Sequence, residues 1–239
     1  MPSYVSRLES RQHVAGGTLE IRLQKPPEFR FRAGQYADVV LIDPPFRDIG
    51  GNLRTFSILS APFQTDLEFV MRLSNTAFKR VLDTMAIGTP LNLLGPAGEF
   101  QLHDDPTRPA VLLAGGVGIA PFISILRQAH HDGLKHSVYL FYSNRQSADI
   151  AYLPELRTLV STDPLHFHFI PTISGTAEAK WPGETGRIDA AMLRRHIPPR
   201  TRPMYYIAGP SQFAGGMISV LTANDVGESD VKVEDFGEL

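Results

Sequence analysis

The chain has 239 residues, and its 23 lysine and arginine residues nearly balance its 25 aspartate and glutamate residues. The absence of a basic excess and of a long apolar run argues against nucleic acid and membranes as partners. The chain contains no cysteine, which excludes disulfides, thiolate zinc sites and cysteine-held iron–sulfur clusters within these residues. We expect a cytoplasmic protein of two compact domains.

The first hundred residues have the pattern of a small antiparallel β-barrel. Short strand-like runs alternate with glycine- and proline-rich turns. One helical pattern interrupts them, and Gly88 ends it. The predicted strands cover 19–25, 36–42, 54–59, 67–73 and 91–95, and the predicted helix covers 78–87.

From about residue 105 onward, apolar runs alternate with helical segments, which is typical of a parallel sheet covered by helices. We therefore predict a β-barrel domain over 1–104 and an α/β domain over 105–239. The expected strands cover 110–116, 137–143, 165–173 and 204–210, and the expected helices cover 121–131 and 152–160.

The segment LLAGGVGIAP has the features of a phosphate-binding loop. A buried strand runs into Gly115, Gly116 and Gly118, and a helix begins near Pro121. Glycines let the backbone approach a pyrophosphate, and the helix N-terminus supplies free N–H groups. The spacing differs from Gly-x-Gly-x-x-Gly, so a standard Rossmann dehydrogenase is not expected.

Ligands of a parallel sheet gather at the carboxyl ends of its strands. The Gly209 loop is therefore expected to face the same crevice as the Gly115 loop, with Thr172 on its wall. Arg145 and Arg187 are candidate ligands for nucleotide phosphates, although each also fits a solvated surface position.

The strand Arg54-Thr55-Phe56-Ser57 completes a set of motifs that resembles the ferredoxin–NADP reductase superfamily over nearly the whole chain. The strand period places Arg54 and Phe56 on one face of the strand, and Thr55 and Ser57 on the other. The matching segments are RAGQYADV (32–39), RTFSILSAP (54–62), LLGPAGEF (93–100), LLAGGVGIAPFISIL (112–126), YYIAGPSQF (205–213) and EDFGEL (234–239).

This resemblance implies a flavin site in the first domain, with the strand Arg54–Ser57 at its centre. It implies a pyrophosphate contact for Arg54, a ring contact for Phe56 and a hydroxyl near flavin N5 for Ser57. A site that holds a pyrophosphate implies FAD rather than FMN. The other implied flavin contacts are Thr55, the backbone of Val70, Met71 and Arg72, and the N–H groups of Ala77, Phe78 and Lys79.

The resemblance also implies a nicotinamide site and a reaction centre. Gly115, Gly116, Gly118 and Pro121 match the nucleotide loop, and Thr172 and Gly209 match its walls. Glu234 matches an acidic residue of the reaction centre, and Phe236 an aromatic that covers the ring. Many relatives have cysteine where this chain has Ala208, so one contact to the reacting nicotinamide is absent.

NADPH is the expected coenzyme, with NADH as the alternative. The second strand of the α/β domain ends in Ser143-Asn144-Arg145 without an adjacent acid, and Arg145 suits a 2′-phosphate. Tyr152 is available to stack on adenine. Many NADH-using relatives also carry an Asn-Arg pair here, and Ile173 stands where some NADP enzymes place an arginine.

The sequence thus predicts an oxidoreductase that transfers hydride from NAD(P)H to FAD. Electrons then pass to a ferredoxin, a flavodoxin, an oxygenase component or a small molecule. The alternative is a non-catalytic electron-transfer or regulatory subunit that retains the fold. No metal site is expected from the pairs His130-His131 and His166-x-His168, and Ser57 lacks the elbow motif of a hydrolase nucleophile.

Overall fold

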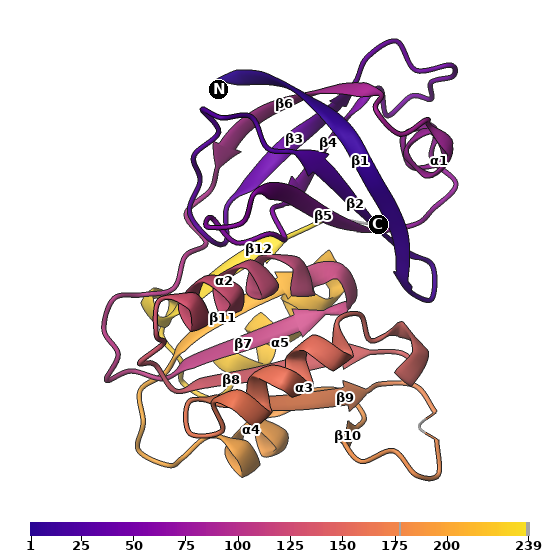
Figure 1. The fold of residues 1–239 in the computed structure, drawn as a ribbon. Helices are drawn as coiled ribbons and strands as arrows, with labels where there is room; N and C mark the ends of the chain where they lie inside the picture. The colour runs from indigo at the N-terminus through magenta and orange to yellow at the C-terminus, as the bar shows by residue number, and fades with distance from the viewer. Residues whose placement is uncertain (177, 238–239) are drawn as a thin grey trace. The chain divides into compact units, whose positions relative to one another are not determined.

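The computed structural model describes residues 1–176 and 178–237 (Figure 1). Its contacts divide the chain into two compact units. Unit 1 comprises Met1–Gln101 and Ala120–Asp132, and unit 2 comprises Leu102–Ile119 and Gly133–Leu239. The chain therefore passes between the units more than once. The functional boundary near residue 105 stays a prediction.

Unit 1 is built on an antiparallel six-stranded sheet with the strand order β4-β3-β6-β1-β2-β5. The edge strands β4 and β5 also contact each other, so the sheet curls toward closure. The predicted antiparallel first domain is confirmed. The strands are β1 Ser3–Ala15, β2 Thr18–Gln24, β3 Tyr36–Leu41, β4 Leu53–Ser57, β5 Asp66–Arg72 and β6 Pro90–Ala97.

The long strand β1 has no counterpart in the sequence prediction. Its sequence is SYVSRLESRQHVA, and only Ser6 and Leu8 are buried. Burial alternates over Ser3–Leu8, but the inward residue Ser6 is polar and the outward residue Val5 is apolar, so the sequence lacks the alternation that marks a half-buried strand. Pairing with β2 on one side and β6 on the other forms this strand instead.

The core of unit 1 lies inside the curled sheet. On β2, Leu19, Ile21 and Leu23 all point inward and are fully buried. Helix α1 (Ala77–Thr84) contributes Phe78 and Leu82 to the same core. The sheet, including its edge strands β4 and β5, and helix α1 are thus joined by one core.

Helix α1 is shorter than the predicted 78–87. Thr76 caps its N-terminus by accepting a hydrogen bond from the Lys79 N–H at 3.4 Å. At the other end the backbone of Met85 is extended, and the Arg11 guanidinium donates to the carbonyls of Leu82 and Met85. An arginine from β1 therefore satisfies the last carbonyls before Gly88 is reached.

Unit 2 contains a parallel six-stranded sheet with the order β10-β9-β8-β7-β11-β12, which confirms the predicted α/β fold. Every residue of β7 is buried, as its continuous apolar run predicts. The strands are β7 Ala110–Gly115, β8 Val138–Asn144, β9 Phe167–Ile173, β10 Glu184–Thr185, β11 Met204–Gly209 and β12 Val231–Asp235.

Helices α4 and α5 cover one face of this sheet, and α3 contacts β9. The sequence prediction lacked α4, α5 and β12. Helix α5 contains the pair Gly215-Gly216, which weakens a helical pattern. The helices are α2 Ile119–His131, α3 Leu153–Thr162, α4 Ala190–His196 and α5 Ser211–Thr222, with short helices η1 Gly116–Gly118, η2 Ser147–Asp149 and η3 Glu228–Asp230.

Within 1–176 and 178–237, no helix has both the length and the apolar character needed to cross a bilayer. The last two residues of the matching segment 234–239 lie outside the described residues.

Candidate functional site: a basic cradle in unit 1 and a glycine loop in unit 2

The glycine loop of unit 2 requires glycine for two different reasons. A Cβ at Gly115 would lie 2.6 Å from the Phe213 ring, and one at Gly118 would lie 2.1 Å from the Ala208 carbonyl oxygen. Gly116 has φ +54°, and a Cβ there would meet no atom within 4 Å. Gly115 therefore permits close packing against Phe213 of α5 and Gly118 against β11, whereas Gly116 permits the turn beside open space.

The predicted loops meet at the carboxyl edge of the parallel sheet. A Cβ at Gly209 would lie 3.1 Å from the Gly115 carbonyl oxygen, so the two strand ends are adjacent. The Phe236 N–H donates to the Gly209 carbonyl at 3.0 Å, and Glu234 on β12 lies opposite Ala208. Residues from three strands of unit 2 thus gather at one edge.

Thr172 lies on β9 and is fully buried. Its hydroxyl contacts the Met192 sulfur at 3.7 Å, on the side of the sheet that α4 covers. Its side chain therefore takes part in packing within unit 2, and its role toward a coenzyme stays a prediction.

A pocket of about 550 Å³ lies beyond the ends of β8 and β9, and it brings Arg145 and Arg187 together. Glu178 also lines this pocket. The sequence gives no signal for Glu178, because it is far from Arg145 along the chain and belongs to no motif. The complete lining is Arg145, Gln146, Ser147, Ala148, Ser174, Gly175, Thr176, Glu178 and Arg187.

In unit 1, Arg54 is positioned by the loop that precedes β4. Its guanidinium donates to the carbonyls of Gly50 and Leu53 at 2.5 and 2.6 Å, and it lies 3.8 Å from the Asp48 carboxylate. A Cβ at Gly50 would lie 2.3 Å from the guanidinium, so glycine leaves the space that Arg54 occupies. The glycine-containing loop before β4 thus orients the predicted phosphate ligand.

Lys79 is nearly buried, with 7% of its surface exposed, and it lies in the first turn of α1. Burial, and then the positive charge of Arg54, lower the pKa of Lys79 below its usual range. Within the described part of the chain, the Lys79 ammonium forms no hydrogen bond or ion pair. Two cations therefore lie close together beside a helix N-terminus, which favours an anion there.

Asp48 belongs to the same cradle. Its carboxylate accepts hydrogen bonds from the N–H groups of Ala77 at 2.5 Å and Gly50 at 2.9 Å. The Ala77 hydrogen bond is the main cause that lowers the pKa of Asp48. The negative charge of Asp48 stabilises the start of α1. It balances only part of the positive charge of Arg54 and Lys79.

The predicted flavin contacts on strand β4 alternate between its two faces, as the two-residue period of a strand requires. Arg54 and Phe56 both contact the Phe78 ring, at 5.3 and 6.0 Å, so they share a face. On the other face the Thr55 hydroxyl donates to the Asp38 carboxylate at 2.5 Å, and Ser57 is almost fully buried. The strand separates a cationic and aromatic face from a hydroxyl face.

Strand β5 is the edge strand whose backbone is predicted to line a flavin. Val70 and Met71 are buried in unit 1. The Arg72 guanidinium donates to the Gly16 carbonyl at 2.5 Å, which fixes the end of the strand against the β1–β2 turn. An edge strand retains free backbone groups on its outer side, which suits the predicted role.

These residues fit a flavin dinucleotide. An arginine whose side chain is 25% exposed, an almost buried lysine and the start of α1 form a site for a pyrophosphate. The aromatic side chain of Phe56 lies on the same strand. The fit rests on the positive charge that Asp48 leaves unbalanced.

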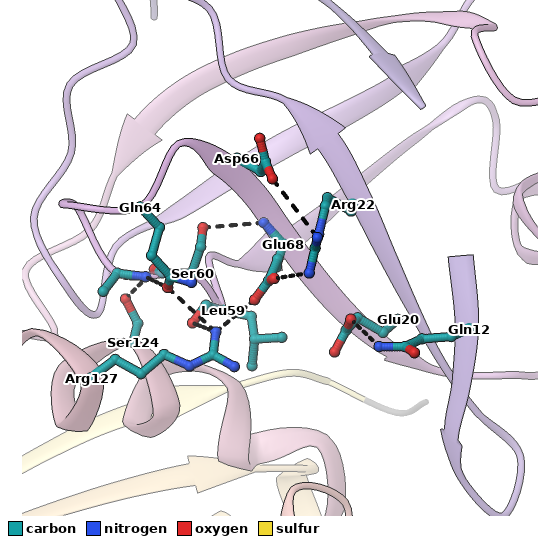
Figure 2. Close-up of polar contacts among 11 residues, drawn as sticks. Gln12, Glu20, Arg22, Leu59, Ser60, Gln64, Asp66, Glu68, Ser124 and Arg127 are labelled. Carbon is teal, nitrogen blue, oxygen red and sulfur yellow. Dashed lines mark hydrogen bonds and ion pairs between the residues drawn. The ribbon is translucent and has the colours of Figure 1, made fainter. Parts of the chain in front are cut away.

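Helix α2, which follows the glycine loop, is anchored to unit 1 by a polar network (Figure 2). The Ser124 hydroxyl donates to the Ser60 carbonyl at 2.7 Å, and the Arg127 guanidinium donates to the Glu68 carboxylate at 2.6 Å. Arg22 on β2 bonds the other carboxylate oxygen of Glu68 at 2.8 Å. Pro121, in the first turn of α2, thus begins a helix that is fixed to β5.

The histidines considered for a metal site have structural partners. His131 stacks on the Phe63 ring, His166 pairs with Asp163 at 2.8 Å, and His168 stacks on Tyr139. Within the described residues, no group of three histidine, aspartate or glutamate side chains is arranged to hold a metal ion.

Comparison with known proteins finds matches that include residues of both units. Residues 112–218 match the family of oxidoreductase NAD-binding domains. The reductase component of propane 2-monooxygenase from Mycolicibacterium goodii is 30% identical over 226 residues, which cover 92% of this chain and 63% of that protein. The phenol hydroxylase P5 protein of Acinetobacter pittii is 29% identical over 220 residues, covering 90% of this chain and 60% of that protein. The chain thus spans less than two thirds of these relatives.

Solved structures share the fold of the whole chain. An Amycolatopsis cytochrome P450 reductase superposes with a TM-score of 0.83 at 22% identity, covering 99% of this chain and 71% of that one. A ferredoxin–NADP⁺ reductase from Neisseria gonorrhoeae, solved with FAD and NADP, superposes with a TM-score of 0.81 at 19% identity, covering 98% of each chain. Residues 112–218 thus match an oxidoreductase NAD-binding family, and the whole chain shares the fold of ferredoxin–NADP⁺ reductase structures.

Proposed function

We propose that this chain is an FAD-dependent NAD(P)H oxidoreductase that passes electrons to an oxygenase component. The observation that carries the proposal is the nearly buried Lys79 beside Arg54 at the start of α1. Such a pair of cations is stabilised by a pyrophosphate, which FAD has and FMN lacks. The NAD-binding family match over residues 112–218 supports the coenzyme half of the reaction.

In unit 1, Arg54 and Lys79 bind the pyrophosphate, together with the N–H groups at the start of α1. Phe56 offers an aromatic face, and the backbone of β5 lines the ring. The bound flavin supplies the redox chemistry, because it accepts hydride from a nicotinamide and releases electrons to an acceptor. Ser57 and Glu234 are proposed as the polar side chains of the reaction centre, and Phe236 as the aromatic that covers the ring.

In unit 2, the backbone at Gly115, Gly116 and Gly118 approaches the coenzyme, and Gly209 keeps the adjacent strand end free of a side chain. Arg145 and Arg187 line the pocket beyond β8 and are placed to attract a phosphate. We therefore propose NADPH as the favoured coenzyme, with NADH also accepted.

An oxygenase component is the acceptor that the relatives support, since several of them are reductase components or subunits of monooxygenases. The 239 residues contain no cysteine, so they hold no cysteine-bound iron–sulfur relay between the flavin and an acceptor.

One experiment tests the proposal and its alternative. The purified protein, supplied with FAD, should show a flavin absorbance spectrum that NADPH or NADH bleaches under anaerobic conditions. Mass spectrometry of the cofactor released by heat should find FAD. Recovery of FMN alone would overturn the pyrophosphate site, and a bound flavin that neither coenzyme reduces would favour the non-catalytic subunit.

A further inference from the structure

The pocket beyond β8 and β9 contains one acidic side chain among its cationic and hydroxyl groups. Arg145 follows β8, Arg187 follows β10, and Glu178 lies in the loop after β9. The volume of about 550 Å³ is in the usual range for a small-molecule site. All of these residues belong to unit 2.

The two arginines of the pocket are available to a ligand. Neither guanidinium forms a hydrogen bond or ion pair with any residue among 1–176 and 178–237. Arginine binds phosphate through two parallel N–H donors and stays charged at all physiological pH values. The pocket therefore suits a phosphate, and no residue of the glycine loop lines it.

The position of Glu178 is built by the loops around it. The Ser147 hydroxyl donates to the Glu178 carboxylate, which links η2 to the loop after β9. The Gly175 N–H donates to the Arg145 carbonyl at 3.1 Å, and the Trp181 N–H donates to the Glu178 carbonyl at 3.0 Å. A carboxylate is thus held in the wall that also carries Arg145.

Building on the proposed NAD(P)H function, we propose that Glu178 is a specificity-determining residue that limits the preference of this pocket for NADPH over NADH. The two coenzymes differ only at the 2′ position of the adenosine ribose, which carries a phosphate in NADPH and a hydroxyl in NADH. A carboxylate accepts a hydrogen bond from a hydroxyl but repels a phosphate dianion. Glu178 therefore weakens the binding of NADPH, which Arg145 and Arg187 favour. It strengthens the binding of NADH.

The variant Glu178→Gln tests this role, since it removes the charge and keeps the size and the ability to bond Ser147. Binding of 2′,5′-adenosine bisphosphate and of 5′-AMP to the FAD-loaded protein is measured by calorimetry. Glu178→Gln should bind the bisphosphate more tightly by about fivefold or more, because removing the repulsion between even two unit charges at about 4 Å in a water-like dielectric has that effect. Its affinity for 5′-AMP should not increase.

The control variant Glu228→Gln makes the same change in net charge at an exposed residue outside the pocket. It should bind both nucleotides as the wild type does. Salt gives a second readout, since the gain from Glu178→Gln should shrink toward onefold at about 1 M salt if it is electrostatic. A purely structural effect would persist at high salt and would overturn the proposal.

The possible outcomes distinguish a failure of the role of Glu178 from a failure of the proposed oxidoreductase function. If the wild type binds both nucleotides and Glu178→Gln leaves their affinity ratio unchanged, the role of Glu178 is overturned and the oxidoreductase proposal stands. If the wild type binds neither nucleotide nor either coenzyme, the proposed function fails, and the role of Glu178 fails with it.

Discussion

Arg127 on α2 donates a hydrogen bond of 2.6 Å to the carboxylate of Glu68 on β5, whose side chain is 6% exposed. Because Arg22 bonds the other oxygen of the same carboxylate, one nearly buried negative charge holds two cations (Figure 2). Removing the carboxylate would leave both guanidinium groups without this partner.

The first prediction concerns the stability of this network. Glu68→Gln should lower the free energy of unfolding by about 3 kcal/mol, since breaking a buried pair leaves an uncompensated charge. The neighbouring Asp66 lies 3.9 Å from Arg22 and is 33% exposed, so Asp66→Asn should cost less than about 1 kcal/mol. Urea unfolding of both variants checks the contrast, and equal losses would contradict it.

The second prediction concerns the flavin pyrophosphate. Arg54→Ala should weaken FAD binding by about tenfold or more, because a charge-assisted contact to phosphate contributes roughly 1.5–3 kcal/mol. Fluorescence titration with FAD measures this loss. Arg47→Ala is the matched control, since Arg47 lies in the same loop and is 56% exposed. Full flavin occupancy in purified Arg54→Ala would show that Arg54 is not the phosphate ligand.

The third prediction concerns the reaction centre. Ser57→Ala should slow the reduction of bound FAD by NAD(P)H while the protein retains its flavin. Anaerobic stopped-flow absorbance, which follows a single turnover, separates the two effects. A reduction rate equal to that of the wild type would remove Ser57 from the reaction centre.

The fourth prediction concerns the coenzyme. Arg145→Ala should reduce kcat/KM for NADPH by about tenfold or more and change the value for NADH by less than about twofold, because one charge-assisted phosphate contact is lost. Steady-state kinetics with both coenzymes provides the measurement. A wild-type preference for NADH that the substitution leaves unchanged would assign Arg145 to the surface only.

The fifth prediction concerns pH and stability. Burial lowers the pKa values of His103 and His136 below the usual 6.5, and the two rings are in edge contact at 4.8 Å. His103 also bonds the Tyr206 hydroxyl at 2.9 Å, and Arg108, Lys232, Asp104 and Asp105 are the charged groups that act on this pair.

The unfolded state therefore takes up protons near pH 6.5, before the folded state does, so stability falls as the pH drops below that value. Urea unfolding between pH 7.5 and pH 5.5 should show this decline, in a window above the range where carboxylates titrate. His136→Asn should reduce the slope, while His130→Asn, at an exposed histidine, should leave it unchanged. Identical slopes in all three proteins would rule out a contribution from His136.

The sequence was sufficient for the fold where local pattern and tertiary environment agree. The apolar run of β7 and the glycines after it predict a buried strand and a tight loop, and the structure has both. Strand β1 escaped prediction because its neighbours, rather than its own side chains, determine its conformation. Helix α5 escaped because a pair of glycines masks its pattern.

The residues of the candidate sites likewise fall into those that the sequence predicts and those that only the structure reveals. Arg54 and the glycine loop belong to short motifs, so adjacent residues identify them. Asp48 approaches Ala77 and Glu178 approaches Ser147 only after folding, and each pair is separated by about thirty residues. No local periodicity connects such residues, and only the folded chain shows that an acid lies beside each pair of cations.

The membership of α2 in unit 1 has a consequence for dissecting the protein. A cut near residue 105 yields a first fragment without the helix that supplies Ser124 and Arg127, and a second fragment that carries this helix without Ser60 and Glu68. Because residues 119–126 are buried in the intact chain, the second fragment exposes an apolar helix and is expected to aggregate. A chimaera that exchanges the flavin unit with that of a relative must therefore carry over residues 120–132 as well, in a two-segment graft.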